Sequence, residues 1–162
     1  MAGMHALHKI LANVSRPQRQ SVAPGEFLEI EPDIFGVILG VNGVEATRMS
    51  ADLAELGITK LPIGERIVAV ADHASPAPTV AIAGSQKLWR DFFRSHGIRT
   101  FDGGAGVSHL VLCEEGVVRP GMLGIAIDSH APTMGAIGMY ATSLGGGRLT
   151  LYALGRYVIQ AP

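Results

Sequence analysis

The chain has 162 residues, 48% of them hydrophobic and 17% charged, which is enough for one domain with a buried core. Its 13 Lys and Arg residues balance 14 Asp and Glu residues without forming a basic stripe, which argues against non-specific nucleic-acid binding. The single cysteine, Cys113, excludes an internal disulfide and a multi-cysteine metal site. The N-terminus has no long apolar run, so we expect no signal peptide, no membrane span and a cytoplasmic location.

Apolar spacing in the first third of the chain predicts two helices separated by extended segments. Apolar residues recur at helical spacing over residues 4–14, and residues 27–30 alternate as a strand does. The apolar run 34–39 is either a second strand or a buried loop. Asn42 is a helix N-cap with Glu45 in a capping-box position, and the buried face and terminator that follow are Ala46, Met49, Leu53, Leu56 and Gly57.

The middle of the chain predicts a buried parallel strand over residues 66–71 that ends at Asp72 and His73. The prolines that follow prevent the strand from continuing, so this pair lies at a strand end. A helix is predicted over residues 85–96, where a protonated His96 would favour the helix dipole. Its expected core-facing side chains are Leu88, Trp89, Phe92 and Phe93.

The last third alternates short strands with glycine-rich loops. A strand over residues 98–101 leads into the glycine loop 103–106, after which Ser108 is expected to cap a short helix that reaches Glu114. A buried strand over residues 122–127 ends at Asp128, Ser129 and His130. Glycines at 145–147 open a last short helix, and residues 157–159 form a final strand.

This alternation predicts a three-layer α/β/α domain with a mostly parallel sheet, and residues 1–162 are expected to form that single domain. In such sheets, ligands bind outside the carboxyl ends of the strands. Asp72-His73, the glycine loop and Asp128-Ser129-His130 all follow predicted strands. The sequence therefore predicts one site where these segments meet.

An aspartate beside a histidine holds the imidazole in one tautomer and raises its basicity. His73, His109 and His130 are thus candidate acids or bases, oriented by Asp72 and Asp128. The backbone of the glycine loop could hold a carboxylate or a phosphate, and the candidate anion-binding residues are Gly104, Gly106, Ser108 and Ser129. Each pattern also has a purely structural explanation. A zinc or iron site made of the three histidines and Asp128 is possible but not favoured.

Six stretches carry a resemblance to a known family, in the same order along the chain: residues 6–12 (ALHKILA), 22–33 (VAPGEFLEIEPD), 71–73 (ADH), 106–109 (GVSH), 115–122 (EGVVRPGM) and 128–136 (DSHAPTMGA). The chain resembles the N-terminal part of the aconitase superfamily, in particular the large subunits of 3-isopropylmalate dehydratase and homoaconitase. The resemblance implies the aconitase-type N-terminal fold and a hydro-lyase that isomerises a hydroxy di- or tricarboxylate.

The resemblance also implies roles for single residues around a [4Fe–4S] cluster with one open iron position. Asp72 and His73 match the pair that protonates the departing hydroxyl. His109 and Asp128 match a second pair near the iron-bound oxygen, and His130 matches a residue that hydrogen-bonds the iron-bound water. A poor leaving group needs a Lewis acid together with a positioned proton donor, which agrees with these roles.

The cluster of the family is held by three cysteines beyond the matched region, and the family's serine base belongs to another domain or subunit. Cys113 stands where the family usually has proline. The resemblance therefore implies that this chain does not ligate the cluster. It works with a cluster-bearing domain or subunit and with a small swivelling subunit, and it is inert alone.

Two positions depart from the family pattern. Leu39-Gly40 replaces a common His-Asp, and Gly147-Arg148 replaces a threonine and an acidic residue. Two hypotheses follow: part of a hydro-lyase that acts on an isopropylmalate-like carboxylate, or a non-catalytic domain that binds a carboxylate or regulates a partner.

Overall fold

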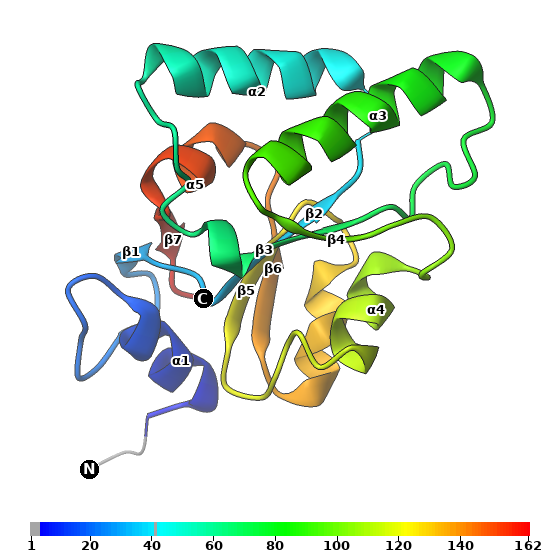
Figure 1. Cartoon of the computed structure of the whole chain (residues 1–162). Coiled ribbons are helices and arrows are strands. Elements are labelled where there is room, and N and C mark those ends of the chain that lie inside the picture. The colour runs from blue at the N-terminus through cyan, green and yellow to red at the C-terminus, as the bar shows by residue number, and fades with distance from the viewer. Residues whose placement is uncertain (1–3, 41) are drawn as a thin grey trace.

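A parallel sheet of five strands forms the middle layer of the molecule (Figure 1). The structure is a computed structural model that describes residues 4–40 and 42–162. The strand order is β4-β3-β2-β5-β6, and each neighbouring pair is parallel. The strands are β2 (Ile34–Ile38), β3 (Ile67–Val70), β4 (Arg99–Phe101), β5 (Leu123–Ala126) and β6 (Tyr140–Ser143). The predicted α/β fold with a mostly parallel sheet is confirmed.

Helices cover both faces of this sheet (Figure 1). One face carries α2 (Gly43–Glu55), α3 (Val80–Ser95) and α5 (Arg148–Leu154), and the other carries α4 (Ser108–Glu114) and the 3₁₀ helix η2 (Ala131–Ile137). Alternate strand residues serve the two faces, as Phe35 packs in the α2–α3 core and Ile34 packs in the α4–η2 core. The three predicted layers are therefore present.

The chain winds outward from β2 in two directions. It runs from β2 through β3 to β4 at one edge of the sheet. It then returns to β5 on the other side of β2 and reaches the second edge at β6. The strand order thus reverses between β2 and β5. In open α/β sheets this switch point is where ligands bind, at the carboxyl ends of the strands.

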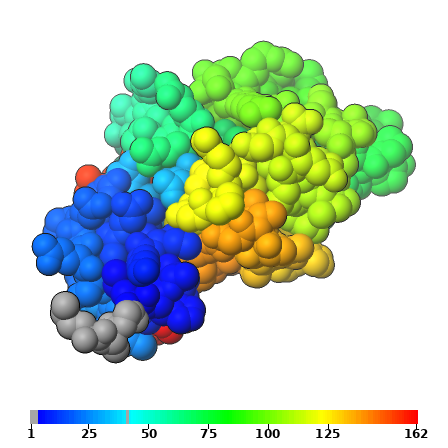
Figure 2. All heavy atoms as spheres, turned by 90° about the horizontal axis from the view of Figure 1, so that it is seen from below, coloured from blue at the N-terminus to red at the C-terminus, as the bar shows by residue number. Residues whose placement is uncertain are grey.

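A small antiparallel ribbon joins the two ends of the described chain. It pairs β1 (Phe27–Ile30) with β7 (Tyr157–Gln160), and α1 (Ala6–Val14) packs beside it. Seen from below, the N-terminal segment lies side by side with the segment around β5 (Figure 2). Among residues 4–40 and 42–162, no helix combines the length and the apolarity that a membrane crossing requires.

Side-chain caps set where α2 and α3 begin. The Asn42 side chain accepts a hydrogen bond from the amide of Val44, as predicted. Thr79 caps α3 in the same way, so this helix begins at Val80, five residues before the predicted start at 85. The first turn of α3 carries no buried side chain, and the cap rather than an apolar stripe marks it.

Several local predictions were wrong. Leu56 and Leu88 are 57% and 45% exposed rather than buried. Leu56 lies beyond the last turn of α2, and Leu88 contacts the start of that helix but stays partly exposed. His96 packs edge-on against Phe92, with the two ring centroids 4.7 Å apart. Burial lowers the pKa of His96, so the end of the helix does not favour a charged imidazole. Neither η2 nor β6 was predicted.

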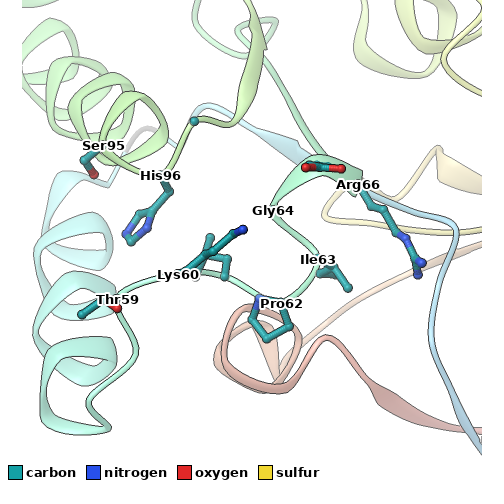
Figure 3. A pocket seen from close by; sticks show the side chains of 11 residues that line it. Thr59, Lys60, Pro62, Ile63, Gly64, Arg66, Ser95 and His96 are labelled. Atoms are coloured by element: carbon teal, nitrogen blue, oxygen red, sulfur yellow. The ribbon is translucent and has the colours of Figure 1, made fainter.

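The amino end of β3 carries a pocket of about 530 Å³ (Figure 3). The segment before this strand and the end of α3 line it, including Lys60, Glu65 and His96. None of the candidate site residues lies in its wall. The predicted functional aspartates lie at the opposite, carboxyl end of the strands.

Candidate active site

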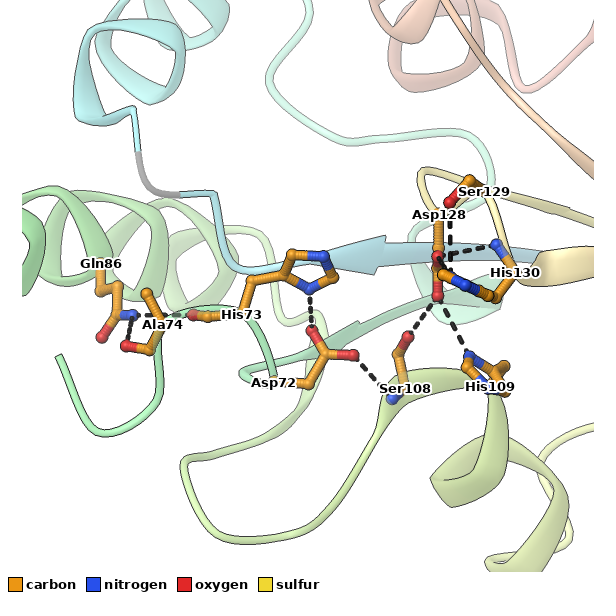
Figure 4. A network of polar contacts seen from close by, with 9 residues as sticks. All are labelled: Asp72, His73, Ala74, Gln86, Ser108, His109, Asp128, Ser129 and His130. Carbon is orange, nitrogen blue, oxygen red and sulfur yellow. Dashed lines mark hydrogen bonds and ion pairs between the residues drawn. The ribbon is translucent and has the colours of Figure 1, made fainter. Parts of the chain in front are cut away.

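Two aspartates flank the carboxyl end of β2. Asp72 lies two residues beyond the end of β3, and Asp128 lies two residues beyond the end of β5. Because β2 lies between these strands, their axes are roughly 10 Å apart. Ser108 lies between the two carboxylates, and the histidines lie around them (Figure 4). Two of the predicted segments, the one with Asp72 and the one with Asp128, therefore meet at the switch point of the sheet.

Asp72 fixes the first histidine. Its Oδ1 lies 2.7 Å from Nδ1 of His73, and its Oδ2 accepts a hydrogen bond of 2.7 Å from the amide of Ser108. Burial of the carboxylate opposes ionisation, but the hydrogen bonds from His73 and Ser108 outweigh it and hold the pKa of Asp72 below its usual value. The side chain of Asp72 is 6% exposed and that of His73 is 54% exposed. The imidazole therefore reaches solvent while a buried carboxylate holds it in place.

Asp128 holds two histidines. Its Oδ2 contacts Nδ1 of His109 at 3.3 Å, and its Oδ1 accepts the amide of His130 at 2.9 Å and contacts Nδ1 of the same residue at 3.2 Å. Desolvation opposes ionisation, yet the hydrogen bonds from His130, Ser108 and His109 lower the pKa of Asp128 to about 2. Because an ionised carboxylate only accepts, both Nδ1 atoms carry protons when they bond to it.

The two histidines on Asp128 stack on each other. Their ring centroids are 5.5 Å apart and the planes make an angle of 24°. The side chain of His109 is 15% exposed and that of His130 is 71% exposed. The imidazole of His109 is therefore shielded beneath that of His130, and His130 is the part of this pair that faces solvent.

Ser108 does not cap α4 as predicted. Val107 is in the capping position, and Ser108 is the first helical residue. Its amide donates to Asp72, and its hydroxyl donates to Oδ2 of Asp128 at 2.9 Å. The prediction failed because the acceptor at this helix start is the carboxylate of Asp72, in the loop after β3 and 36 positions earlier in the chain.

Gln86 was missed by sequence reasoning. It lies on α3 with 3% of its surface exposed, and its amide nitrogen donates to the carbonyls of His73 at 3.3 Å and of Ala74 at 3.1 Å. Ala74 has a φ of +51°, a left-handed backbone that an alanine rarely adopts. The only signal available was a polar residue beside the predicted apolar face of the helix, which is too common to identify such a role.

The remaining predicted residues are Ser129, Gly104 and Gly106. The hydroxyl of Ser129 is 3.3 Å from Nδ1 of His130. Gly104 and Gly106 have φ values of +92° and +129° in the exposed loop before α4. They are not part of the hydrogen-bond network, which contains all the other predicted site residues.

The described residues do not form a metal site. Within 4–40 and 42–162, no group of three or more His, Cys, Asp or Glu side chains is arranged to hold an ion. Burial raises the pKa of the Cys113 thiol, which disfavours the thiolate that binds metals.

The sequence matches known proteins along most of its length. The model of the "Aconitase family (aconitate hydratase)" matches residues 66–160. The homoaconitase large subunit of Thermus thermophilus is 36% identical over 99% of this chain and 37% of its own length. The probable methanogen homoaconitase large subunit of Methanothermobacter thermautotrophicus is 36% identical over 100% of the chain and 38% of its own length.

A relative with a different activity in its name matches equally well. The 3-isopropylmalate dehydratase large subunit of Aquifex aeolicus is 37% identical over 88% of this chain and 32% of its own length. The chain therefore spans about a third of the length of these curated relatives. Its match extends over the strands and loops that carry both aspartates.

Proposed function

This chain belongs to the aconitase family, and on that premise we propose that it is the proton-handling part of a hydro-lyase. The reaction removes water from a hydroxy di- or tricarboxylate and adds it back, and the relatives' names favour a substrate of the isopropylmalate or homoaconitate type. The observation that carries the proposal is the pair of buried, ionised aspartates that fix histidines at the switch point of the sheet.

We assign His73 to the proton transfer. Asp72 engages Nδ1, which leaves Nε2 of the half-exposed imidazole free to give a proton to a departing hydroxyl. A general acid placed in this way contributes about 10²–10⁴-fold to a rate. Gln86 supports this assignment, because it fixes the turn on which His73 stands.

His109 and His130 are proposed to act together around the reacting oxygen. Both present Nε2 away from Asp128, and their stacked rings can hold a proton or donate a hydrogen bond from adjacent positions. The cluster formed by Asp128 thus offers one imidazole that is exposed to solvent and one that is shielded.

Substrate carboxylates are proposed to bind on Gly104, Gly106 and Ser129. The loop backbone offers N–H donors, and the exposed hydroxyl of Ser129, which lies 3.3 Å from Nδ1 of His130, offers another. Ser108 is a less suitable anion ligand than its sequence position indicated, because its amide donates to Asp72 and its hydroxyl donates to Asp128.

The family implies a [4Fe–4S] cluster, and the residues of this chain do not fit as its ligands. Such a cluster is held by thiolates, whereas the sequence has one cysteine, and the described residues form no metal-binding group. We propose that the ligands come from a cluster-bearing domain or subunit outside these 162 residues, and that a small subunit completes the complex. The chain alone is then inert.

A non-catalytic carboxylate-binding domain is the second candidate. Leu39 is fully buried, and a Cβ at Gly40 would lie 2.5 Å from the indole nitrogen of Trp89. This segment therefore offers no polar side chain at the end of β2, where the family commonly has two.

Purification from the source organism separates the two candidates. We expect a cysteine-bearing partner, about four irons per complex, and dehydration of 3-isopropylmalate or homocitrate that the isolated chain lacks. A lone chain without iron that binds citrate-like carboxylates would favour the second candidate. Turnover by the isolated chain would contradict the first.

A further inference from the structure

Ser108 connects the two aspartates across the end of β2. Its amide reaches Oδ2 of Asp72 at 2.7 Å, and its hydroxyl reaches Oδ2 of Asp128 at 2.9 Å (Figure 4). The residue is 5% exposed, so neither hydrogen bond has ready competition from water. Few single residues can hold two side chains from non-adjacent strands, and this one does so from the first position of α4.

The Ser108 hydroxyl and His109 share one acceptor atom. Both the hydroxyl and Nδ1 of the histidine approach Oδ2 of Asp128, at 2.9 and 3.3 Å. The shorter contact belongs to the hydroxyl. Because the hydroxyl can be donor or acceptor but a carboxylate can only accept, the serine proton points to Asp128. The serine thus stabilises the ionised aspartate and limits how closely His109 approaches it.

We propose that Ser108 is a positioning residue that holds Asp72 and Asp128 at a fixed separation and keeps Asp128 ionised beneath its two histidines. This inference rests on the proposed function, in which both aspartates orient catalytic imidazoles. The amide carries one half of the role and survives any side-chain substitution. The hydroxyl carries the other half and can be removed alone.

Few titratable groups face the two carboxylates. Asp72 faces His73, and Asp128 faces His109 from α4 and His130 from its own loop. The helix η2, which packs against α4, has no titratable side chain, and neither has Leu39 or Gly40 at the end of β2. A change in ionisation at Asp128 after substitution of Ser108 is therefore assignable to the lost hydroxyl.

The test is Ser108→Ala in the full chain, with the side-chain carboxyl ¹³C signals of both aspartates followed by NMR against pH. We expect the pKa of Asp128 to rise by about half a unit or more, a change of roughly threefold or more in its protonation constant, and the pKa of Asp72 to rise less, because its main donors are His73 and the Ser108 amide. Ser15→Ala is the matched control, because Ser15 is 1% exposed and its hydroxyl donates to the carbonyl of Ala12, away from the site.

An unchanged Asp128, or equal shifts at Asp72 and Asp128, would overturn the proposal. If Ser108→Ala does not fold, the unchanged chain still decides: the Ser108 amide should report the titration of Asp72, and its Cβ should report that of Asp128. A Ser108 signal that follows neither titration contradicts the bridge. These measurements need no turnover, so failure of the hydro-lyase assay and failure of the bridge are separate results.

Discussion

Buried polar groups are treated differently in the two halves of this molecule. At the carboxyl edge of the sheet, Asp72, Asp128, Ser108 and Gln86 each have at least one hydrogen-bond partner. In the core beneath α2 and α3, Tyr152 is fully buried and its hydroxyl is the one side-chain polar atom among the described residues that is buried without a partner. Its ring packs edge-on against Phe35 and Phe92.

The difference separates polar groups that are held in one orientation from a side chain that only fills the core. A buried polar group with several partners is held in one orientation, whereas a buried hydroxyl without a partner costs free energy and fixes nothing. The edge therefore carries the groups whose orientation matters for chemistry. Tyr152 contributes aromatic volume to a core in which its hydroxyl has no partner.

Asp128→Asn is expected to have the largest effect on stability. Several donors converge on this carboxylate, and the asparagine amide would turn its own donors toward some of them. We expect the free energy of unfolding at pH 7, measured in urea, to fall by about 3 kcal/mol. Asp102→Asn is the control, because Asp102 is 61% exposed and its pair with Arg90 contributes about 1 kcal/mol or less. Equal losses in the two variants would contradict the comparison.

Acid should remove the same stabilisation gradually. The pKa of Asp128 is lowered from 3.8 to about 2 in the folded chain, so its contribution is complete above about pH 4 and is lost as the pH falls toward 2. The shift corresponds to about 2 kcal/mol. Chemical unfolding at a series of pH values should show a shallower acid decline in Asp128→Asn than in the unchanged chain. Parallel declines would show that other carboxylates account for the loss.

Gln86→Leu tests the support beneath His73. The change removes the donor to two carbonyls of a left-handed turn, and we expect a loss of about 1–2 kcal/mol in the free energy of unfolding. Gln160→Leu is matched, because Gln160 donates to the carbonyl of Gly25 at an exposed position. The amide signals of residues 73–75 should move in the first variant only. A stable Gln86→Leu with an unmoved turn would remove Gln86 from the proposed machinery.

Tyr152→Phe should have the smallest effect and the opposite sign. Removing a buried hydroxyl without a partner is expected to raise the free energy of unfolding by about 1 kcal/mol. Tyr157→Phe should change little, since that hydroxyl is exposed. Thermal or urea unfolding measures both. A loss of stability in Tyr152→Phe would mean that the hydroxyl is bonded, for example to an internal water, and that both halves of the molecule satisfy their polar groups.

The sequence predicted the position of the site better than the hydrogen bonds within it. The predicted strands over residues 66–71 and 122–127 are largely apolar runs, each followed directly by an aspartate, Asp72 or Asp128, and they predicted two strand ends on one edge. The structure places both aspartates there. Strand alternation and burial are local properties, so a pattern can show them. Which donor serves which carboxylate depends on packing between distant segments, as in the contact between Ser108 and Asp72.

The missed elements have local explanations. β6 is a short edge strand of mixed composition with one buried residue, Ala141, so it lacks the apolar run that identified β3 and β5. The first turn of α3 is exposed, and Val80 is 90% exposed, so no apolar stripe marked its start. Both failures occurred where the chain contributes little to the core.

The central claim is that His73, held by Asp72, supplies the proton for dehydration. The most direct measurement is the dehydration rate of the complex that copurifies from the source, with His73→Gln compared with the unchanged chain and with His96→Gln as a control at the far end of α3. We predict a loss of at least about 100-fold for His73→Gln at unchanged iron content and a near-normal rate for His96→Gln. A near-normal rate for His73→Gln would contradict the claim.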